Sequence, residues 1–212
     1  MAFPTADAGV RAQDGYQVVD LNDFPEERRY KFLTGSVVPR PIALVTSLGE
    51  EGVLNAAPFS QYVIISVTPP MLGFVAHDQP GGPKDTIRNV LWGKAFVINS
   101  VTESMAQQVQ QCSENYLPSV SEVEQVGFKT LASVHVKPAR IAESPLQFEC
   151  RLARAIEFGN EGSHTTLIVG EVLAVHCAEG VLSGHRIDHA RLNPLGRIAG
   201  RAYCRTGDVL HV

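Results

Sequence analysis

Residues 39–60, with the sequence PRPIALVTSLGEEGVLNAAPFS, constrain the fold more than any other part of the chain. The apolar run at 42–45 is typical of a buried strand. Glycines at 49 and 52 favour a chain reversal, after which a second strand is predicted from Val53. The hairpin is expected to bring four polar residues near one another, with small residues between them that leave the backbone open to a flat or phosphorylated ligand. These four are Thr46, Ser47, Asn55 and Ser60.

The rest of the chain contains many predicted strands and few predicted helices. β-Branched and aromatic residues predict strands at 61–67, 71–76, 95–101, 134–136, 145–157 and 165–177, with a hairpin turn at 158–162. Short helices are predicted at about 23–33, from Lys84 to about Gly93, and at about 102–112. Residues 115–125 and 192–203 have loop character, the former with one or two helical turns. This pattern favours a mainly β (α+β) protein with a closed or nearly closed barrel and a few short helices.

Domain organisation follows from length and from the character of the first residues. Residues 1–20 are small and polar without a regular pattern, so we expect a flexible arm, or a segment ordered only against another subunit. Residues 21–212 are predicted to form one domain, because this length suffices for a single sizeable core.

Composition excludes several classes of function. The net charge of -4 and the pI of about 6.0 give no support for nucleic-acid binding. The four cysteines are widely spaced without a CxxC pair, which is typical of reduced, buried residues. No signal sequence is evident, and no apolar run approaches the roughly 20 residues of a membrane helix. We therefore expect a soluble cytoplasmic protein with no membrane or nucleic-acid partner.

Lys84, Asp85 and Thr86 form the clearest candidate for an anion site. They follow the loop-forming sequence HDQPGGP at 77–83 and precede a short amphipathic helix. The start of such a helix offers backbone N–H groups and a positive dipole end, beside a lysine and a hydroxyl, and this combination suits a phosphate. The alternative is an ordinary helix capped by Asp85 or Thr86, with Lys84 in solvent.

Other polar residues carry weaker predictions. Asn55 and Ser60 suit the polar edge of a heteroaromatic ring, although both also fit ordinary turn and strand positions. Arg40, held between two prolines, either pairs with an anion or points to solvent. A metal site at 185–189 is weighed and set aside, because His-x-x-Asp-His converges only on a helix and has no second cluster to support it. The chain also lacks the G-x-S-x-G, G-x-G-x-x-G and G-x-x-x-x-G-K-[ST] motifs.

Several segments, taken in order, resemble one known family. They are PRPIALVTS, GVLNAAPFS, KDTIRNV and FVIN, followed by HVKPARIAESPLQFECRL, TTLIVGEVLAVH and LNPLGRIAGRAY. Together they resemble the flavin reductase-like family, in particular its flavoredoxin-like branch, over residues 37–203. The resemblance implies an FMN-binding split β-barrel and a homodimer in which each barrel contributes to the FMN site.

The resemblance also implies roles for individual residues. Thr46 and Ser47 would lie beside the flavin, while Asn55, Ala56 and Ser60 would face its rings or ribityl chain. Lys84 and Thr86 would hold the phosphate, with Asn89 in support. The predicted cofactor-binding residues are therefore Arg40, Thr46, Ser47, Asn55, Ala56, Ser60, Lys84, Thr86 and Asn89. The closing segment 197–203 would approach the flavin or the partner subunit.

The implied activity is that of an FMN-dependent oxidoreductase. NAD(P)H would pass a hydride to FMN N5 and so reduce a flavin or another small acceptor; this step needs no acid or base side chain, so no catalytic residue is predicted. An alternative is a flavoredoxin-like electron carrier that lacks an NAD(P)H site and exchanges electrons with a protein partner. A third is a binding protein on the same barrel. The chain departs from two-component monooxygenase reductases by having GSHTTLIVG in place of a GDH-type motif, which leaves His164 as a loose candidate for a nicotinamide contact.

Overall fold

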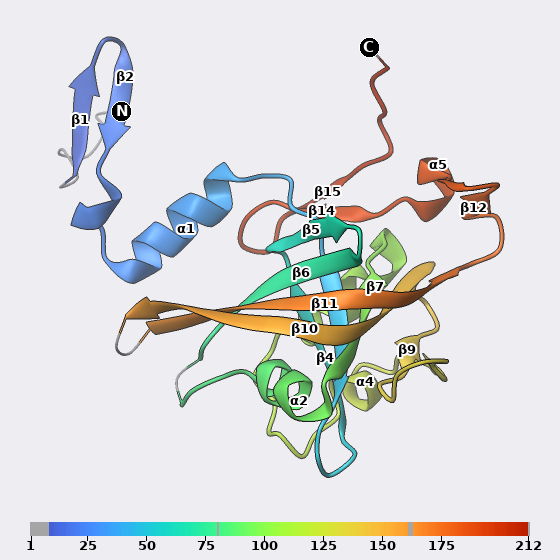
Figure 1. The fold of residues 1–212 in the computed structure, drawn as a ribbon. Helices are drawn as coiled ribbons and strands as arrows, with labels where there is room; N and C mark the ends of the chain where they lie inside the picture. The colour runs from blue at the N-terminus through green and yellow to red at the C-terminus, as the bar shows by residue number, and fades with distance from the viewer. Residues whose placement is uncertain (1–8, 80, 161–162, 212) are drawn as a thin grey trace.

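The computed structural model describes residues 9–79, 81–160 and 163–211 (Figure 1). The strands are β1 (Val10–Gln13), β2 (Tyr16–Val19), β3 (Ala43–Leu48), β4 (Leu54–Phe59), β5 (Tyr62–Val67), β6 (Pro70–His77), β7 (Ala95–Ser100), β8 (Thr130–Leu131), β9 (Arg140–Ile141), β10 (Leu146–Asn160), β11 (Ser163–Cys177), β12 (Leu182–Ser183), β13 (Arg186–Ile187), β14 (Leu195–Arg197) and β15 (Tyr203–Arg205). The helices are α1 (Glu26–Ser36), α2 (Asp85–Gly93), α3 (Ala106–Gln111), α4 (Glu122–Gln125) and α5 (His189–Leu192), with 3-10 turns at Leu21–Asp23 and Glu103–Met105. None of the helices in these ranges is long and apolar enough to cross a membrane.

One curved antiparallel sheet forms the body of the molecule. Its seven strands follow the order β4-β3-β7-β10-β11-β6-β5. The sheet curls until β4 packs on β6, where the rings of Phe59 and Phe74 lie 4.7 Å apart between centroids. Closure therefore comes from side chains, because the edge strands β4 and β5 do not pair within the described chain. This is a split β-barrel, and it confirms the predicted mainly β class.

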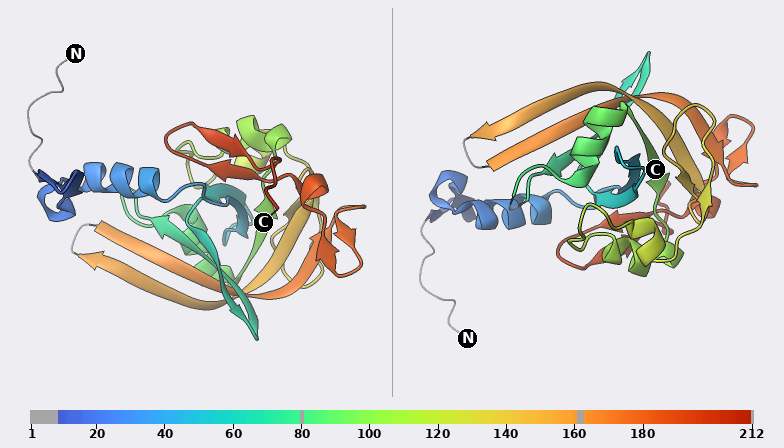
Figure 2. Two further views of the ribbon diagram at one scale, coloured as in Figure 1. Left: turned by 90° about the horizontal axis from the view of Figure 1, so that it is seen from above. Right: turned by 90° about the horizontal axis from the view of Figure 1, so that it is seen from below.

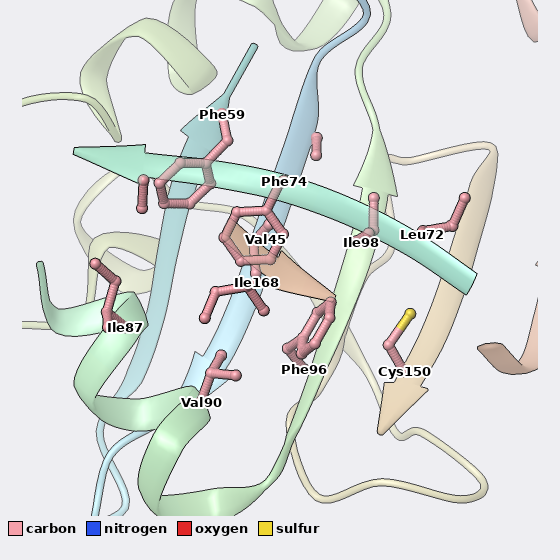
Figure 3. Packing of buried hydrophobic residues seen from close by; sticks show 12 residues of the cluster. Val45, Phe59, Leu72, Phe74, Ile87, Val90, Phe96, Ile98, Cys150 and Ile168 are labelled. Carbon is pink, nitrogen blue, oxygen red and sulfur yellow. The ribbon is translucent and has the colours of Figure 1, made fainter. Parts of the chain in front are cut away.

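The barrel interior is filled by large apolar side chains (Figure 3). Phe74 and Phe96 meet edge to face there, with ring centroids 5.5 Å apart. Ile87 and Val90, on one face of α2, extend this core and cover the barrel, as the predicted amphipathic pattern requires. A second core packs α3 and α4 against the outside of β3, with Leu44 and Met105 among its members.

The N-terminal segment contains a strand pairing that our sequence reasoning did not predict. Its described part contains the hairpin β1–β2, and with α1 it projects away from the barrel (Figures 1 and 2). Asp14 and Gly15 both have positive φ, of 51° and 82°, which is the geometry that an Asp-Gly hairpin turn adopts. α1 also begins later than predicted, after Pro25, and it runs through Gly35 to end at Ser36.

The predicted strand at 134–136 is wrong. These residues form a loop whose three N–H groups donate to the buried carboxylate of Glu149, at 2.8 Å from Val134, 2.6 Å from His135 and 3.2 Å from Val136. His176 Nε2 lies 2.5 Å from the same carboxylate. A charged acceptor therefore takes the N–H groups that a sheet neighbour would otherwise use.

Two other segments are more ordered than predicted. β10 and β11 remain paired as far as Asn160 and Ser163, within the stretch that we assigned to a turn. The tip of the predicted turn, 161–162, lies outside the described residues. In the tail, which we expected to be loop, β14 pairs with β15 through Gly196 and Cys204.

The Glu149 contacts predict a pH-dependent stability. Burial by itself raises the pKa of Glu149, but the N–H groups of Val134 and His135 together with His176 outweigh it, so its pKa lies below the usual 4.5. A carboxyl group with a depressed pKa stabilises the fold above its unfolded pKa, and this stabilisation is lost as the pH falls. We expect Glu149→Gln to lower the free energy of unfolding by about 1–3 kcal/mol at pH 7. The difference from wild type should shrink as the pH falls below 4.5.

Urea unfolding at several pH values measures this difference. Glu157→Gln, at an exposed position on the same strand, is the matched control and should be close to neutral at every pH. A Glu149→Gln effect that does not vary with pH would contradict the proposed charged anchor.

Candidate functional site

The β3–β4 hairpin places most of the predicted site residues at one end of the barrel. Thr46 pairs with Ala56, and Ser47 pairs with Asn55. Alternation along β3 separates the two neighbouring hydroxyls, since Thr46 Oγ1 donates to the carbonyl of Ala139 at 2.6 Å, on the other side from Ser47. Thr46 therefore anchors a loop, and Ser47 faces α2.

Asn55 is the centre of a buried hydrogen-bond network. Its Oδ1 accepts from Thr86 Oγ1 at 2.8 Å and from Ser47 Oγ at 3.3 Å. Asn89 Nδ2 donates to Ser47 Oγ at 3.3 Å and extends the network along α2. The structure thus brings Ser47, Asn55, Thr86 and Asn89 into one cluster, of which the predicted hairpin had grouped only Ser47 and Asn55. Thr86 is engaged with Asn55, so the predicted capping of α2 by Asp85 or Thr86 is wrong; Lys84 occupies the N-cap, with no capping bond from its side chain.

Glu122 completes this network, and our sequence reasoning did not identify it. Its carboxylate accepts from Asn55 Nδ2 at 2.8 Å and from the Ala56 N–H at 3.1 Å. Burial raises the pKa of Glu122, while these hydrogen bonds and the nearby charge of Lys84 oppose the increase. The local signal was only the helix start Ser121-Glu122, where a glutamate is expected to face the helix dipole. α4 instead packs on β4, opposite α2 (Figure 1). The Glu122 carboxylate is thereby directed at Asn55 and Ala56 of β4.

Lys84 lies where α2 begins. The first intrahelical bond is donated by the Ile87 N–H to the Lys84 carbonyl at 2.9 Å, so the N–H groups of Asp85 and Thr86 precede the helical ladder. Burial lowers the pKa of Lys84, and the charge of Glu122 opposes that change. A half-buried cation at a helix start is a favourable environment for an anion.

Ser60 lies away from the other hairpin residues, so our expectation that it joins them is wrong. It follows Phe59, which pairs with Ala43 at the opposite end of β3 from Ser47. Its hydroxyl accepts instead from Arg40 Nε at 3.2 Å. Arg40 Nη1 donates to the carbonyl of Val37 at 2.8 Å and also to that of Thr34, so this buried arginine fastens the end of α1 to the barrel.

Lys84 and Pro58 connect the Asn55 network with the Ser60–Arg40 pair. Both residues line three adjoining cavities. The largest, of about 710 Å³, lies between α1 and the barrel and includes Ser60 and His77 in its wall. His77 belongs to β6 and not to the predicted loop; its ring lies 2.6 Å from Gln61 Oε1 and 3.0 Å from Thr165 Oγ1. Burial and the charge of Lys84 lower its pKa. The volume is that of a small-molecule or cofactor site.

The donor set around the cavities fits a phosphorylated cofactor. Lys84 and the start of α2 provide positive charge at one point of the wall, and Ser60 provides a hydroxyl. The 710 Å³ cavity offers both polar and apolar surface for a ring system.

The segment 185–189 has a structural role, because Asp188 caps α5 by accepting from the Arg191 N–H at 3.1 Å. No cluster of three or more His, Cys, Asp or Glu suited to a metal occurs in the described ranges.

Comparison with curated proteins and solved structures supports a flavin-related assignment. YwrF from Bacillus subtilis (strain 168) is 36% identical over 183 residues, covering 84% of this chain and 89% of YwrF. Nitrilotriacetate monooxygenase component B from Bacillus cereus is 32% identical with a TM-score of 0.90, covering 94% of this chain and 100% of that chain. The 2-nitrobenzoate 2-nitroreductase NbaA from Pseudomonas fluorescens is 33% identical with a TM-score of 0.84, and the match covers 92% of this chain and 94% of NbaA.

More distant structures share the fold. Flavoredoxin of Desulfovibrio vulgaris (Miyazaki F) is 20% identical with a TM-score of 0.72, covering 83% of this chain and 91% of that chain. The family model described as "Flavin reductase like domain" matches residues 34–196, which include every predicted cofactor-binding residue. With its split barrel and its flavin-related relatives, the chain belongs to the flavin reductase-like family.

Proposed function

We propose that the protein is an FMN-dependent oxidoreductase that uses NAD(P)H to reduce a flavin or another small acceptor. The observation that carries this proposal is Lys84 at the start of α2, on the wall of a cavity of about 710 Å³. The flavin-related oxidoreductases among the relatives support it. FMN, when bound, supplies the redox chemistry, and the protein supplies binding, orientation and electrostatics.

The residues of this chain then have two kinds of role. Lys84 holds the phosphate together with the N–H groups at the start of α2. Ser60 and the cavity wall offer hydrogen bonds and packing to the remainder of the cofactor. Ser47, Asn55 and Thr86 are buried, Asn89 is partly buried, and all four are already hydrogen-bonded, so this network supports the backbone around the site and keeps the start of α2 in place. Burial and the charge of Lys84 lower the pKa of His77, which favours the neutral imidazole, a form that can both donate and accept a hydrogen bond.

The proposed function makes a prediction about binding of the FMN phosphate. Lys84→Gln removes the cation but keeps a polar side chain at the N-cap, so we expect FMN to bind roughly 10- to 100-fold more weakly, the effect of one charge-assisted hydrogen bond. Riboflavin, which has no phosphate, should lose little affinity. Quenching of flavin fluorescence measures both ligands.

Lys94→Asn is the matched control for this variant. Lys94 lies at the other end of α2 in a left-handed conformation, with φ 55°, which asparagine tolerates. Its affinity for FMN should equal that of wild type. Equal losses for FMN and riboflavin in Lys84→Gln would contradict phosphate binding at Lys84.

A further prediction concerns the electron donor. Under anaerobic conditions, NADH or NADPH should bleach the visible absorbance of the FMN-loaded protein, because a hydride donor reaches the cofactor from the open cavity. Dithionite serves as the control that the bound flavin can be reduced. Flavin that dithionite bleaches but neither nucleotide does would contradict NAD(P)H use and favour the electron-carrier alternative.

We also propose a homodimer, on the basis of the edge strand β5. Val63, Ile64, Ile65 and Val67 are 53%, 70%, 43% and 82% exposed, so both faces of this strand carry apolar side chains in water. The strand has no neighbour on its outer side in the described chain, and with β6 it projects from the body (Figure 2). An apolar edge strand of this kind is normally covered by a partner.

Light scattering tests the assembly. The wild-type protein should have twice the chain mass of 23.0 kDa, and Ile64→Lys should shift the population toward the single chain. Leu131→Lys, at a residue that is 45% exposed on β8, is the control and should leave the mass unchanged. A wild-type protein of single-chain mass would overturn the dimer while leaving the FMN proposal intact.

A further inference from the structure

The cavity that adjoins the proposed cofactor site is lined by cations without a facing carboxylate. It has a volume of about 350 Å³, and Arg40, Lys84 and Arg197 lie in its wall beside Tyr203. We refer to it as the arginine cavity. None of the described residues that line it is an aspartate or a glutamate. Glu122 acts on Lys84 from outside this cavity, so the charges without a counter-charge are those of the two arginines, and these favour an anionic ligand.

Backbone pairing brings the two arginines together. The Arg40 N–H donates to the Arg197 carbonyl at 3.0 Å, and the Arg197 N–H donates to the Arg40 carbonyl at 2.8 Å. Segments from opposite ends of the barrel domain therefore meet at a single antiparallel bridge. This bridge uses main-chain atoms only. A substitution of the Arg197 side chain therefore keeps the backbone hydrogen bonds that position this residue.

Each arginine side chain is held in position by its surroundings. The Arg197 guanidinium lies over the Tyr203 ring, 4.5 Å from its centroid, and Nη1 donates to Gln110 Oε1 at 3.3 Å. Tyr203 Oη donates to the same oxygen at 3.1 Å. Arg40 is held by Ser60 and by carbonyls at the end of α1. These neutral partners orient the guanidinium groups and leave their charges uncompensated.

The electrostatics agree with an anion site. Burial lowers the pKa of Arg40; Tyr30 opposes this, and the charge of Arg197 lowers it further. Burial likewise lowers the pKa of Lys84. The large cavity also has acidic groups in its wall, namely Glu26, Glu27 and Asp78. A ligand that spans both cavities would therefore direct its anionic end toward the arginines.

We propose that the arginine cavity binds the carboxylate or phosphate of the second substrate, the small molecule that exchanges electrons with the cofactor. This inference rests on the proposed function, in which Lys84 and the start of α2 hold the phosphate of FMN itself. Arg197, which is only partly buried, is then left for a different oxyanion, with the charge of the buried Arg40 beside it. The planar guanidinium matches such a group in shape and charge. The substrate class is a small organic anion.

Calorimetric titration of the oxidised, FMN-loaded protein tests the proposal with two ligand pairs. Benzoate and benzamide differ in a carboxylate charge, and NADP⁺ and NAD⁺ differ in the 2′-phosphate. The variant is Arg197→Gln, with Arg197→Lys as the charge-conserving form. Arg201→Gln is the matched control, because Arg201 is exposed in the same tail and does not line the cavity. FMN affinity is measured on each variant by fluorescence quenching, and thermal unfolding checks the fold.

We expect the wild-type protein to bind the anionic or more anionic member of at least one pair more tightly than the other member. Arg197→Gln should lower the affinity for that member about tenfold or more. The uncharged or less charged member, and FMN, should be unaffected. Arg197→Lys should recover part of the preference, and Arg201→Gln should behave as wild type. An effect on the benzoate pair identifies a carboxylate ligand, and an effect on the NADP⁺ pair identifies the nucleotide phosphate.

Three outcomes would overturn the inference: no preference for either anion in wild type, a preference that Arg197→Gln leaves intact, or a loss confined to FMN. The last would assign the arginines to the cofactor phosphate. A wild-type protein that fails to bind FMN would contradict the proposed function instead. The ligand pairs would then be compared on the unloaded protein, where the same predictions for Arg197 hold.

Discussion

The burial of β3 on both faces is the constraint on which the rest of this structure depends. Val45 points into the barrel core, and Leu44 points into the outer core that holds α3 and α4. A one-residue shift of a strand buried on both sides would exchange the side chains that the two cores receive and disrupt the packing of both. The β3–β4 hairpin is therefore fixed in position, and so is everything attached to it: the start of α2 on one side, α4 on the other and the cavity wall at Pro58.

Buried polar groups between these layers add specificity to the apolar packing. Glu122 reaches across from α4 to the Asn55 amide and the Ala56 N–H, and Thr86 reaches Asn55 from α2. Loss of one partner would leave a buried donor or acceptor unsatisfied, at a cost of about 1–3 kcal/mol. Lys84 and Glu122 also stabilise each other's charged form. The charge of Lys84 lowers the pKa of Glu122, and the charge of Glu122 raises the pKa of Lys84, each against the effect of burial.

Local pattern predicted most strands of the main sheet and the buried face of α2, but it did not predict contacts between distant segments. The apolar run at 42–45 and the spacing of Ile87 and Val90 indicated a buried strand and the buried face of α2, and both are confirmed. The Val-rich segment at 134–136 has β propensity, yet Glu149 takes its N–H groups and keeps it a loop. Glu122 meets Asn55 across 67 positions of sequence, a distance over which residue spacing carries no information.

Hydrogen-bond occupancy separates the residues that support the site from those that face a ligand. Thr46, Ser47, Ala56 and Thr86 are at most 1% exposed, and the three hydroxyls already have protein partners. Lys84, by contrast, lines every one of the three adjoining cavities and lacks a capping bond. Motif matching treats these residues alike because they occur together in sequence. The physical distinction is that a buried, satisfied hydroxyl sets the position of the backbone, whereas a half-buried cation beside open volume still has binding energy to offer an anion.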